Sequence, residues 1–284
     1  MSENPVPETT VRHPRFPLVP GIAGGMGPHA HVCLERRLLE LAARRFDIRG
    51  DADYPDWVVS SVPQTPDRTE ALTGRGADPS AALAYSLRRL KAAGADFAAI
   101  ACNTAHAFLP AMWRAGHVPL PVVHVVLETL AALRVRHPLV RRVGLLATTG
   151  TCRSELFARA FGQAGIEVLL PDQAGQESVM TAIYGPVIGG RRAGGIKAGV
   201  LDGGISSPRR LLWREAGELV DAGAQAVVVA CSEISMAVSL DRSEAAALGA
   251  PILDSMDVLA DAILDLASGQ RPLHALAGPE DWPG

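Results

Sequence analysis

The sequence predicts an α/β fold of two pseudo-symmetric domains, each a parallel sheet flanked by helices, with the active site in the cleft between them. Three observations predict this fold. Segments with strand character alternate with segments of helix character, which is typical of parallel sheets covered by helices. The strand segments are near-continuous runs of Val, Ile and Ala, as in strands buried on both faces. The two halves of the chain also resemble each other.

Length and composition suit two domains better than one. The chain has 284 residues, of which 48% are hydrophobic, so each half can bury a core of its own. We predict a first domain over 17–138 and a second over 139–250, with a C-terminal helix over 251–268 packing back on the first. Residues 1–16 carry three prolines and many polar residues and are predicted to be a flexible arm. Residues 269–284 are predicted to be a tail.

The first half begins with a strand at 16–25 that runs into a glycine turn. A helix is predicted over 78–94, with Asp78 as its N-cap, Pro79 in its first turn and Gly94 at its end. The other predicted elements are a helix at 29–45, a strand and Pro-rich loop at 56–69, strands at 95–102 and 118–126, and a helix at 127–138.

The same pattern then restarts. A helix is predicted to open at Ser207 and Pro208 and to run to Gly223, after a longer loop. The other predicted elements of the second half are a strand and turn at 141–151, a helix at 153–165, strands at 166–171 and 224–231, and a final strand and helix at 251–268.

Two pairs of segments support an internal duplication. The segment AGADFAAIACNTA (93–105) matches AGAQAVVVACSEI (222–234), 129 positions later. Upstream, GIAGGMGP (21–28) matches GLLATTGT (144–151), 123 positions later. The two matches occur in the same order and in nearly the same register, and their period is too long for a solenoid, so the repeated unit is a domain.

Charge and hydropathy exclude several classes of protein. The formal net charge is −3 without a basic stripe, so nucleic acid is not expected as a partner. No apolar stretch reaches the roughly 20 residues of a membrane span, and the N-terminus lacks the apolar core of a signal peptide. We therefore expect a cytoplasmic protein without a membrane partner.

Two of the four cysteines occupy equivalent positions. Cys102 and Cys231 each follow a buried strand, whereas Cys33 and Cys152 lie in helical segments and are expected to be small buried hydrophobic side chains. The cysteine spacings contain no CxxC pair and no zinc pattern. The sequence also has no evident binding site for a metal or an electron-sink cofactor, so none is expected.

Ligands of parallel sheets bind beyond the carboxyl ends of the strands, so the two thiols are predicted to face one cleft. A thiolate that removes a proton from one face of a carbon, and a thiol that donates one to the other face, would invert that carbon. We expect the helix starts after each cysteine to lower the thiol pKa values and to bind a carboxylate.

Six motifs in this chain resemble, in their order, those of the aspartate/glutamate racemase family, in its cofactor-independent aspartate racemase branch. They are GGMGP (24–28), PDRT (66–69), ACNTAH (101–106), GLLATTGT (144–151), IKAG (196–199) and ACSEI (230–234). The resemblance covers about residues 18–268 and implies an amino-acid racemase, usually dimeric, that needs no pyridoxal phosphate.

The resemblance also implies roles for individual residues. Cys102 and Cys231 would be the paired acid and base, supported by Asp67 and Glu233. A side-chain carboxylate would be recognised by Arg68 and Lys197. The remaining substrate-binding residues would be Asn103, Thr104 and Ser232 at the α-carboxylate, together with Met26 and Thr149.

The chain departs from the family pattern in three places. His29, Ala30 and His31 follow GGMGP where the family usually has a small or acidic residue, Ala and Thr, and we expect both histidines to be helix-start or surface residues. CSEI replaces the commoner CTEI but keeps the hydroxyl. The glycine-rich segment 185–195 is longer than expected and would suit an active-site lid with Arg191 and Arg192.

Two rival functions stay open from the sequence. One is a related isomerase or decarboxylase acting on a dicarboxylate, in which one thiol acts alone, so the presence of both cysteines argues against it. The other is an amino-acid binding protein without catalysis. The preferred amino acid, the cysteine that serves the L-face, the dimer geometry and the pathway are not determined by the sequence.

Overall fold

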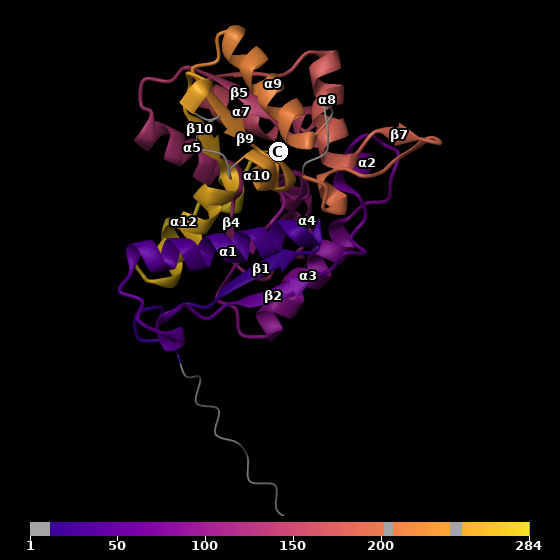
Figure 1. The fold of residues 1–284 in the computed structure, drawn as a ribbon. Coiled ribbons are helices and arrows are strands. Elements are labelled where there is room, and N and C mark those ends of the chain that lie inside the picture. The colour runs from indigo at the N-terminus through magenta and orange to yellow at the C-terminus, as the bar shows by residue number, and fades with distance from the viewer. Residues whose placement is uncertain (1–11, 202–206, 239–245, 284) are drawn as a thin grey trace, which may run out of the picture.

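The computed structural model describes residues 12–201, 207–238 and 246–283. Two four-stranded parallel sheets and a small antiparallel hairpin make up its β-structure (Figure 1). The first sheet has the order β2-β1-β3-β4 and the second β10-β9-β5-β6. The strands of the first sheet are β1 (Pro20–Gly24), β2 (Val58–Ser61), β3 (Phe97–Ile100) and β4 (Val122–Val123). Those of the second are β5 (Arg142–Leu146), β6 (Glu167–Leu169), β9 (Ala226–Val229) and β10 (Ile252–Asp254).

The two sheets have the same topology and the same register. Each sheet places its first strand in chain order between its second and third, with the fourth outside the third. Gly21 of β1 lies opposite Ala98 of β3, and Gly144 of β5 lies opposite Val227 of β9. These partners are related by the two sequence offsets, 123 and 129. The pseudo-symmetry predicted from the sequence is therefore confirmed, as is the fold class.

Helices follow the strands in both halves. The helices of the first half are α1 (Pro28–Arg45), α2 (Arg68–Leu72), α3 (Ser80–Ala92), α4 (Leu109–Arg114) and α5 (Val125–Arg136). Those of the second are α6 (Thr149–Arg153), α7 (Leu156–Gln163), α8 (Gln173–Tyr184), α9 (Pro208–Asp221), α10 (Ser232–Val238) and α12 (Ser255–Ala267).

A shared hydrophobic core lies between the two sheets. It joins side chains of α1, α5, α7 and α12 with one face of each sheet, for example Ile22 of β1 and Val143 of β5. Because side chains alternate along a strand, the neighbours Ala23 and Leu146 face the two outer cores. Helix α3 covers the outer face of the first sheet and α9 that of the second. Helix α12 packs on α1 and α5.

Several local predictions are corrected by the structure. The N-cap of α3 is Pro79 rather than Asp78, although the Asp78 carboxylate still accepts the Ser80 N–H. The strand predicted over 118–126 has only the two residues of β4, because α5 already begins at Val125. Ser207 does cap α9, with Pro208 in its first turn.

The longer loop predicted before α9 contains regular structure. Helix α8 is capped by Asp172, whose carboxylate accepts the Gly175 N–H at 2.7 Å. The hairpin of β7 (Val187–Ile188) and β8 (Arg191–Arg192) follows, and it projects from the body of the molecule (Figure 1). A short 3-10 helix at Ile196–Ala198 then carries Lys197.

The ends of the described chain pack against the body. Residues 1–11 of the predicted arm 1–16 lie outside the described residues. In the described part of the arm, Phe16 is buried in the shared core. In the tail, Trp282 is buried in the outer core of the first sheet. The domain boundaries stay a prediction.

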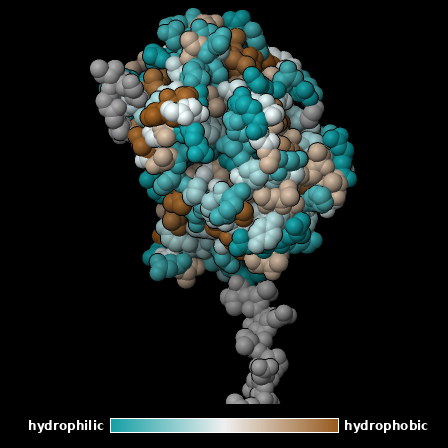
Figure 2. Space-filling model, turned by 90° about the vertical axis from the view of Figure 1, so that its right-hand side faces the viewer, coloured by the Kyte–Doolittle hydropathy of each residue, from teal (hydrophilic) through white to brown (hydrophobic). Residues whose placement is uncertain are grey.

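The surface is mixed in polarity. On the face shown in Figure 2, hydrophobic side chains form small separate groups among hydrophilic ones. None of the described helices is long and apolar enough to span a membrane.

Candidate active site

The two equivalent strands β3 and β9 place Cys102 and Cys231 at their carboxyl ends. Cys102 precedes a short 3-10 helix over Asn103–Phe108, and Cys231 precedes α10. Both thiols are free and nearly buried, with 5% of Cys102 and 3% of Cys231 exposed. The duplicated topology thus brings the two cysteines to equivalent ends of their sheets.

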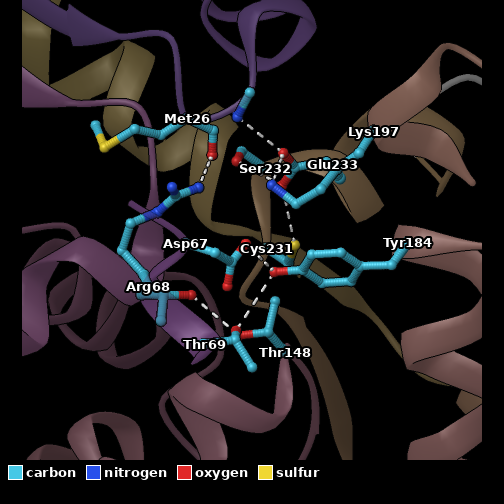
Figure 3. Close-up of polar contacts among 12 residues, drawn as sticks. Met26, Asp67, Arg68, Thr69, Thr148, Tyr184, Lys197, Cys231, Ser232 and Glu233 are labelled. Atoms are coloured by element: carbon cyan, nitrogen blue, oxygen red, sulfur yellow. Dashed lines mark hydrogen bonds and ion pairs between the residues drawn. The ribbon is translucent and has the colours of Figure 1, made fainter. Parts of the chain in front are cut away.

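Glu233 connects Cys231 with Lys197 (Figure 3). The Cys231 thiol donates to Oε2 at 3.4 Å, and the Lys197 ammonium lies 3.1 Å from Oε1. Oε1 also accepts the backbone N–H of Gly27 at 3.0 Å, across the junction of the two halves. Glu233 is itself 4% exposed, so its charge is compensated inside the protein.

The electrostatics at Cys231 correct one expectation. Burial, and next the negative charge of Glu233, raise the pKa of the Cys231 thiol well above its ordinary value, although Lys197 and the N–H groups at the start of α10 oppose this. The helix start therefore does not lower the pKa overall. Burial also acts to raise the pKa of Glu233, but Lys197 and the Gly27 N–H outweigh it and hold that pKa low.

Arg68 lies next to Cys102. Its guanidinium donates to the carbonyl of Met26 at 2.6 Å and to those of Thr65 and Pro66, and it is 6% exposed. Burial acts to lower its pKa, but the neighbouring Cys102 and Asp67 raise it overall. The buried Nε has no hydrogen-bond partner among the described residues, so one donor of the guanidinium is unused.

Lys197 carries a partly buried ammonium group beside Glu233. Burial acts to lower its pKa, but the negative charge of Glu233 outweighs this effect and raises the pKa overall. Its ammonium also lies 5.1 Å from the centre of the Tyr184 ring.

Tyr184 is a site residue that the sequence reasoning missed. At the end of α8, its hydroxyl donates to Asp67 Oδ2 at 3.0 Å in the other half of the chain (Figure 3). Asp67 also caps α2 by accepting the Glu70 N–H at 3.0 Å. Asp67 thus contacts Tyr184 and the start of α2, and its support of a thiol stays a prediction. A contact across 117 positions leaves no periodic signal in the sequence.

The remaining predicted residues surround the cysteines. Asn103 donates to Ser255 Oγ at 3.0 Å, while its buried Oδ1 has no hydrogen-bond partner within the described part of the chain. Thr104 contacts the hydroxyls of Thr148 and Thr151 in the other half, at 3.0 and 2.8 Å. Ser232 donates to Glu233 Oε2.

Thr149 and the two histidines complete the predicted set. Thr149 Oγ1 accepts from the Gln176 amide at 3.2 Å. His31 is buried and accepts the Gly25 N–H, whereas His29 is exposed. Within the described ranges, no group of three or more His, Cys, Asp or Glu could hold a metal ion.

A duplicated parallel α/β fold with paired buried cysteines defines the class of protein, and the comparisons give its family. Residues 24–263 match the Asp/Glu/Hydantoin racemase family, and the chain belongs to that family. It is therefore an isomerase of the racemase type.

Individual relatives agree with this assignment. The broad specificity amino-acid racemase RacX of Bacillus subtilis is 25% identical over 242 residues, which cover 84% of this chain and 94% of that protein. The aspartate racemase of Picrophilus torridus has a similar structure, with a TM-score of 0.69, 24% identity and coverage of 88% of this chain and 94% of that one. The glutamate racemase of Francisella tularensis, in complex with D-glutamate, gives a TM-score of 0.57 at 16% identity, covering 88% and 80%.

Proposed function

We propose that this protein racemises an amino acid with an acidic side chain, aspartate or glutamate, by two-base proton transfer between Cys102 and Cys231. One cysteine, as thiolate, takes the α-proton from one face and becomes a thiol. The other, as thiol, gives its proton to the opposite face and becomes a thiolate. The substrate leaves with its configuration inverted, and the charges of the two cysteines are exchanged.

The placement of the two cysteines carries this proposal, because each thiol is nearly buried at the carboxyl end of an equivalent strand, β3 or β9. Contacts between the halves beside these strand ends, from Gly27 to Glu233 and from Thr104 to Thr148, support two sulfurs that address one small space. Lys197, paired with Glu233, adds a cation on the side of Cys231. Arg68 adds a second cation beside Cys102. Two cations near two thiols would favour the thiolate form and an anionic substrate.

We assign the other residues by the same reasoning. Asn103, Thr104 and Ser232 would hold the α-carboxylate, and the unpartnered Asn103 Oδ1 fits an additional contact to the α-ammonium group. Asp67 and Glu233 would hold Tyr184 and Cys231 in place, with Met26 and Thr149 bordering the substrate. No cofactor takes part in the proposed reaction.

A broader substrate range is a second candidate, favoured by one observation. Lys197 is already paired with Glu233, and Arg68 already donates to three backbone carbonyls. Cations engaged in this way would select an acidic side chain less strictly. The broad specificity of the relative RacX agrees with this second candidate.

Proton exchange tests the proposal directly. Each common L- and D-amino acid is offered to the protein in deuterium oxide, and loss of the α-proton is followed by NMR. We expect exchange with aspartate or glutamate, whereas exchange with many amino acids would favour the second candidate. A binding protein would exchange none. A dicarboxylate decarboxylase or isomerase would convert its own substrate without exchanging the amino acids.

We further propose a cytoplasmic homodimer that binds no nucleic acid or membrane. Light scattering after size-exclusion chromatography tests the dimer, because a monomer of 29.8 kDa and a dimer differ twofold in mass. A monomeric mass at assay concentrations would contradict this part of the proposal.

A further inference from the structure

The backbone carbonyl of each cysteine is contacted by the side chain four residues later. His106 Nδ1 lies 3.0 Å from Cys102 O, and Ser235 Oγ lies 3.2 Å from Cys231 O. The two cysteines are 129 positions apart, and so are His106 and Ser235. The duplication has therefore kept the place of this contact while the residue type differs.

Behind His106 lies a set of neutral rings, which we call the first anchor: His106, His124 and Trp282. His106 Nε2 accepts the Val125 N–H at 3.4 Å, so the hydrogen resides on Nδ1, which donates to Cys102 O. The His124 ring packs edge-on against His106 with centroids 4.9 Å apart, and Trp282 lies 5.7 Å from His124. All three side chains are buried, so the C-terminal tail packs behind the Cys102 turn.

Behind Ser235 lies a set of charged groups, the second anchor: Ser235, Asp254 and Arg37. The Ser235 hydroxyl lies 2.6 Å from Asp254 Oδ1, so its one hydrogen is shared between this carboxylate and Cys231 O. Arg37 donates to Asp254 Oδ2 at 3.0 Å and to the Ser235 carbonyl at 3.1 Å. Arg37 is 6% exposed and belongs to α1, in the first half of the chain.

The middle members of the two anchors are also equivalent. His124 directly follows β4, and Asp254 is the last residue of β10, the equivalent strand. The register confirms the match, because Ala99 pairs with Val123 and Val228 pairs with Leu253, one residue before each. The outer members come from elsewhere: Trp282 from the tail and Arg37 from α1.

We propose that the two anchors position the two catalytic cysteines independently, so that Trp282 acts on Cys102 and Arg37 and Ser235 act on Cys231. This inference rests on the proposed function for its catalytic meaning, but not for its geometry. All six side chains act through the cysteine backbone and are positioning residues. Separate anchors allow the base and the acid to be placed separately on the two sides of one carbon.

Alkylation of individual thiols tests the inference without relying on activity. The protein is treated with iodoacetamide, and the rates at Cys102 and Cys231 are measured by mass spectrometry of their peptides. Cys152 serves as the internal reference for general opening of the structure, because Cys33 lies near Arg37 and Asp254 of the second anchor. We expect Trp282→Ala to change the rate at Cys102 at least threefold and to leave Cys231 unchanged. Ser235→Ala should do the opposite.

Matched controls separate positioning from general damage. Ser178→Ala removes a hydroxyl that bonds a carbonyl four residues back in α8, as Ser235 does in α10, but away from both thiols. Trp113→Ala removes an exposed tryptophan. Neither control should alter either cysteine. The conservative variants Trp282→Phe and Arg37→Lys keep a ring and a charge. In each of them, the cysteine of the same anchor should be alkylated at close to its wild-type rate.

Kinetic isotope effects give the catalytic readout. With α-deuterated substrate, slower proton abstraction by one cysteine enlarges the isotope effect in the direction where that cysteine is the base, and reduces it in the other direction. We expect Trp282→Ala and Ser235→Ala to enlarge it for opposite enantiomers.

Equal changes in the alkylation rates of both thiols, or no change at either thiol, would overturn the proposal of two separate anchors. If alkylation separates as expected but the wild-type protein exchanges no amino acid, the anchors stand and the proposed function fails. If the wild-type protein racemises but both variants enlarge the isotope effect for the same enantiomer, the assignment of one anchor to each cysteine fails.

Discussion

The Cys231 thiol donates to Glu233 Oε2 at 3.4 Å, while Oε1 of the same carboxylate lies 3.1 Å from the Lys197 ammonium. One buried carboxylate thus keeps a proton on the thiol and holds a cation beside it. The pKa of Cys231 is raised as a result, first by burial and then by this carboxylate. For Cys231 to act as a base, substrate binding has to lower the pKa of its thiol, so that the cations outweigh burial and Glu233.

Glu233→Gln is therefore expected to have two opposite effects. Removing the negative charge lowers the pKa of Cys231, so its alkylation at pH 8 should become several-fold faster. Racemisation should fall at least ~10-fold, because a general acid whose position and pKa are altered loses part of its ~10²–10⁴-fold contribution. Glu128→Gln is the matched control, since Glu128 is a buried carboxylate paired with Arg271 away from the thiols. Slower alkylation of Cys231 would contradict this account.

Cys102→Ser and Cys231→Ser should each reduce racemisation by roughly 10³-fold or more, because a serine hydroxyl cannot replace the acid or the base. Either variant can still exchange the α-proton of one enantiomer. Cys33→Ser and Cys152→Ser should keep normal turnover. Chiral chromatography of the product measures the turnover of all four variants. Near-normal turnover of Cys102→Ser or Cys231→Ser would refute the two-base scheme.

Tyr184→Phe removes the hydroxyl that links α8 to Asp67 and keeps the ring beneath Lys197. We expect a loss of about 1 kcal/mol, or roughly fivefold in kcat/KM, as for one hydrogen bond. The exposed Tyr85 provides the control variant Tyr85→Phe. An unchanged kcat/KM would mean that this contact between the halves has no part in binding or turnover.

The pseudo-symmetry also predicts equal costs at two glycines. A Cβ on Gly21 would lie 2.9 Å from Ala95 Cβ and 3.1 Å from Leu90 Cβ. A Cβ on Gly144 would lie 2.8 Å from Leu219 Cβ and 3.3 Å from Ala224 Cβ, the equivalent residues of the other half. Gly21→Ala and Gly144→Ala should each destabilise the protein by about 1–3 kcal/mol through overpacking.

The control for these two variants is Gly162→Ala in α7, where no described atom outside the adjacent residues and the helix's own nearby backbone lies within 4 Å of the added Cβ. It should stabilise the protein by about 0.5–1 kcal/mol, the helix propensity of alanine over glycine. Urea unfolding measures all three variants. A clear difference between Gly21→Ala and Gly144→Ala would show that the two halves pack differently at these positions.

Two buried histidines predict loss of stability in acid. Burial lowers the pKa of His106 to about 4 and that of His124 well below its ordinary 6.5. Between pH 6.5 and 4 these histidines bind protons in the unfolded chain but not in the folded protein. Their contribution to the free energy of unfolding is therefore fully present above pH 6.5 and is lost as the pH falls toward 4. For His106 alone the loss is about 3 kcal/mol.

Urea unfolding between pH 7.5 and 4.5 checks this expectation. His124→Phe should reduce the loss, because phenylalanine binds no proton, whereas replacing the exposed His274 by Phe should leave it unchanged. Wild-type protein that keeps its full stability down to pH 4.5 would contradict the assignment of both histidines as neutral buried groups.

Short-range patterns explain which elements could be predicted. The apolar runs gave β3 and β9, and Ser207-Pro208 gave the start of α9, because burial and capping act on adjacent residues. Helix α8 was not predicted, although Asp172 as its N-cap and the helical spacing of Val179 and Ile183 indicate it. The strand 118–126 was overestimated because β-branched residues there continue into the buried start of α5.

The sequence by itself determined the repeated unit, the pair of equivalent cysteines and the family motifs, because duplication and local burial are recorded in residue order. Only the tertiary structure decided how deeply each thiol is buried and which charged groups lie near it. The pKa of Cys231 depends on how deeply it is buried and on Glu233, and Asp67 accepts the hydroxyl of Tyr184 from the other half of the chain. Electric fields and burial depend on distances in space between residues far apart in the chain, and those distances are fixed only when the two halves pack together.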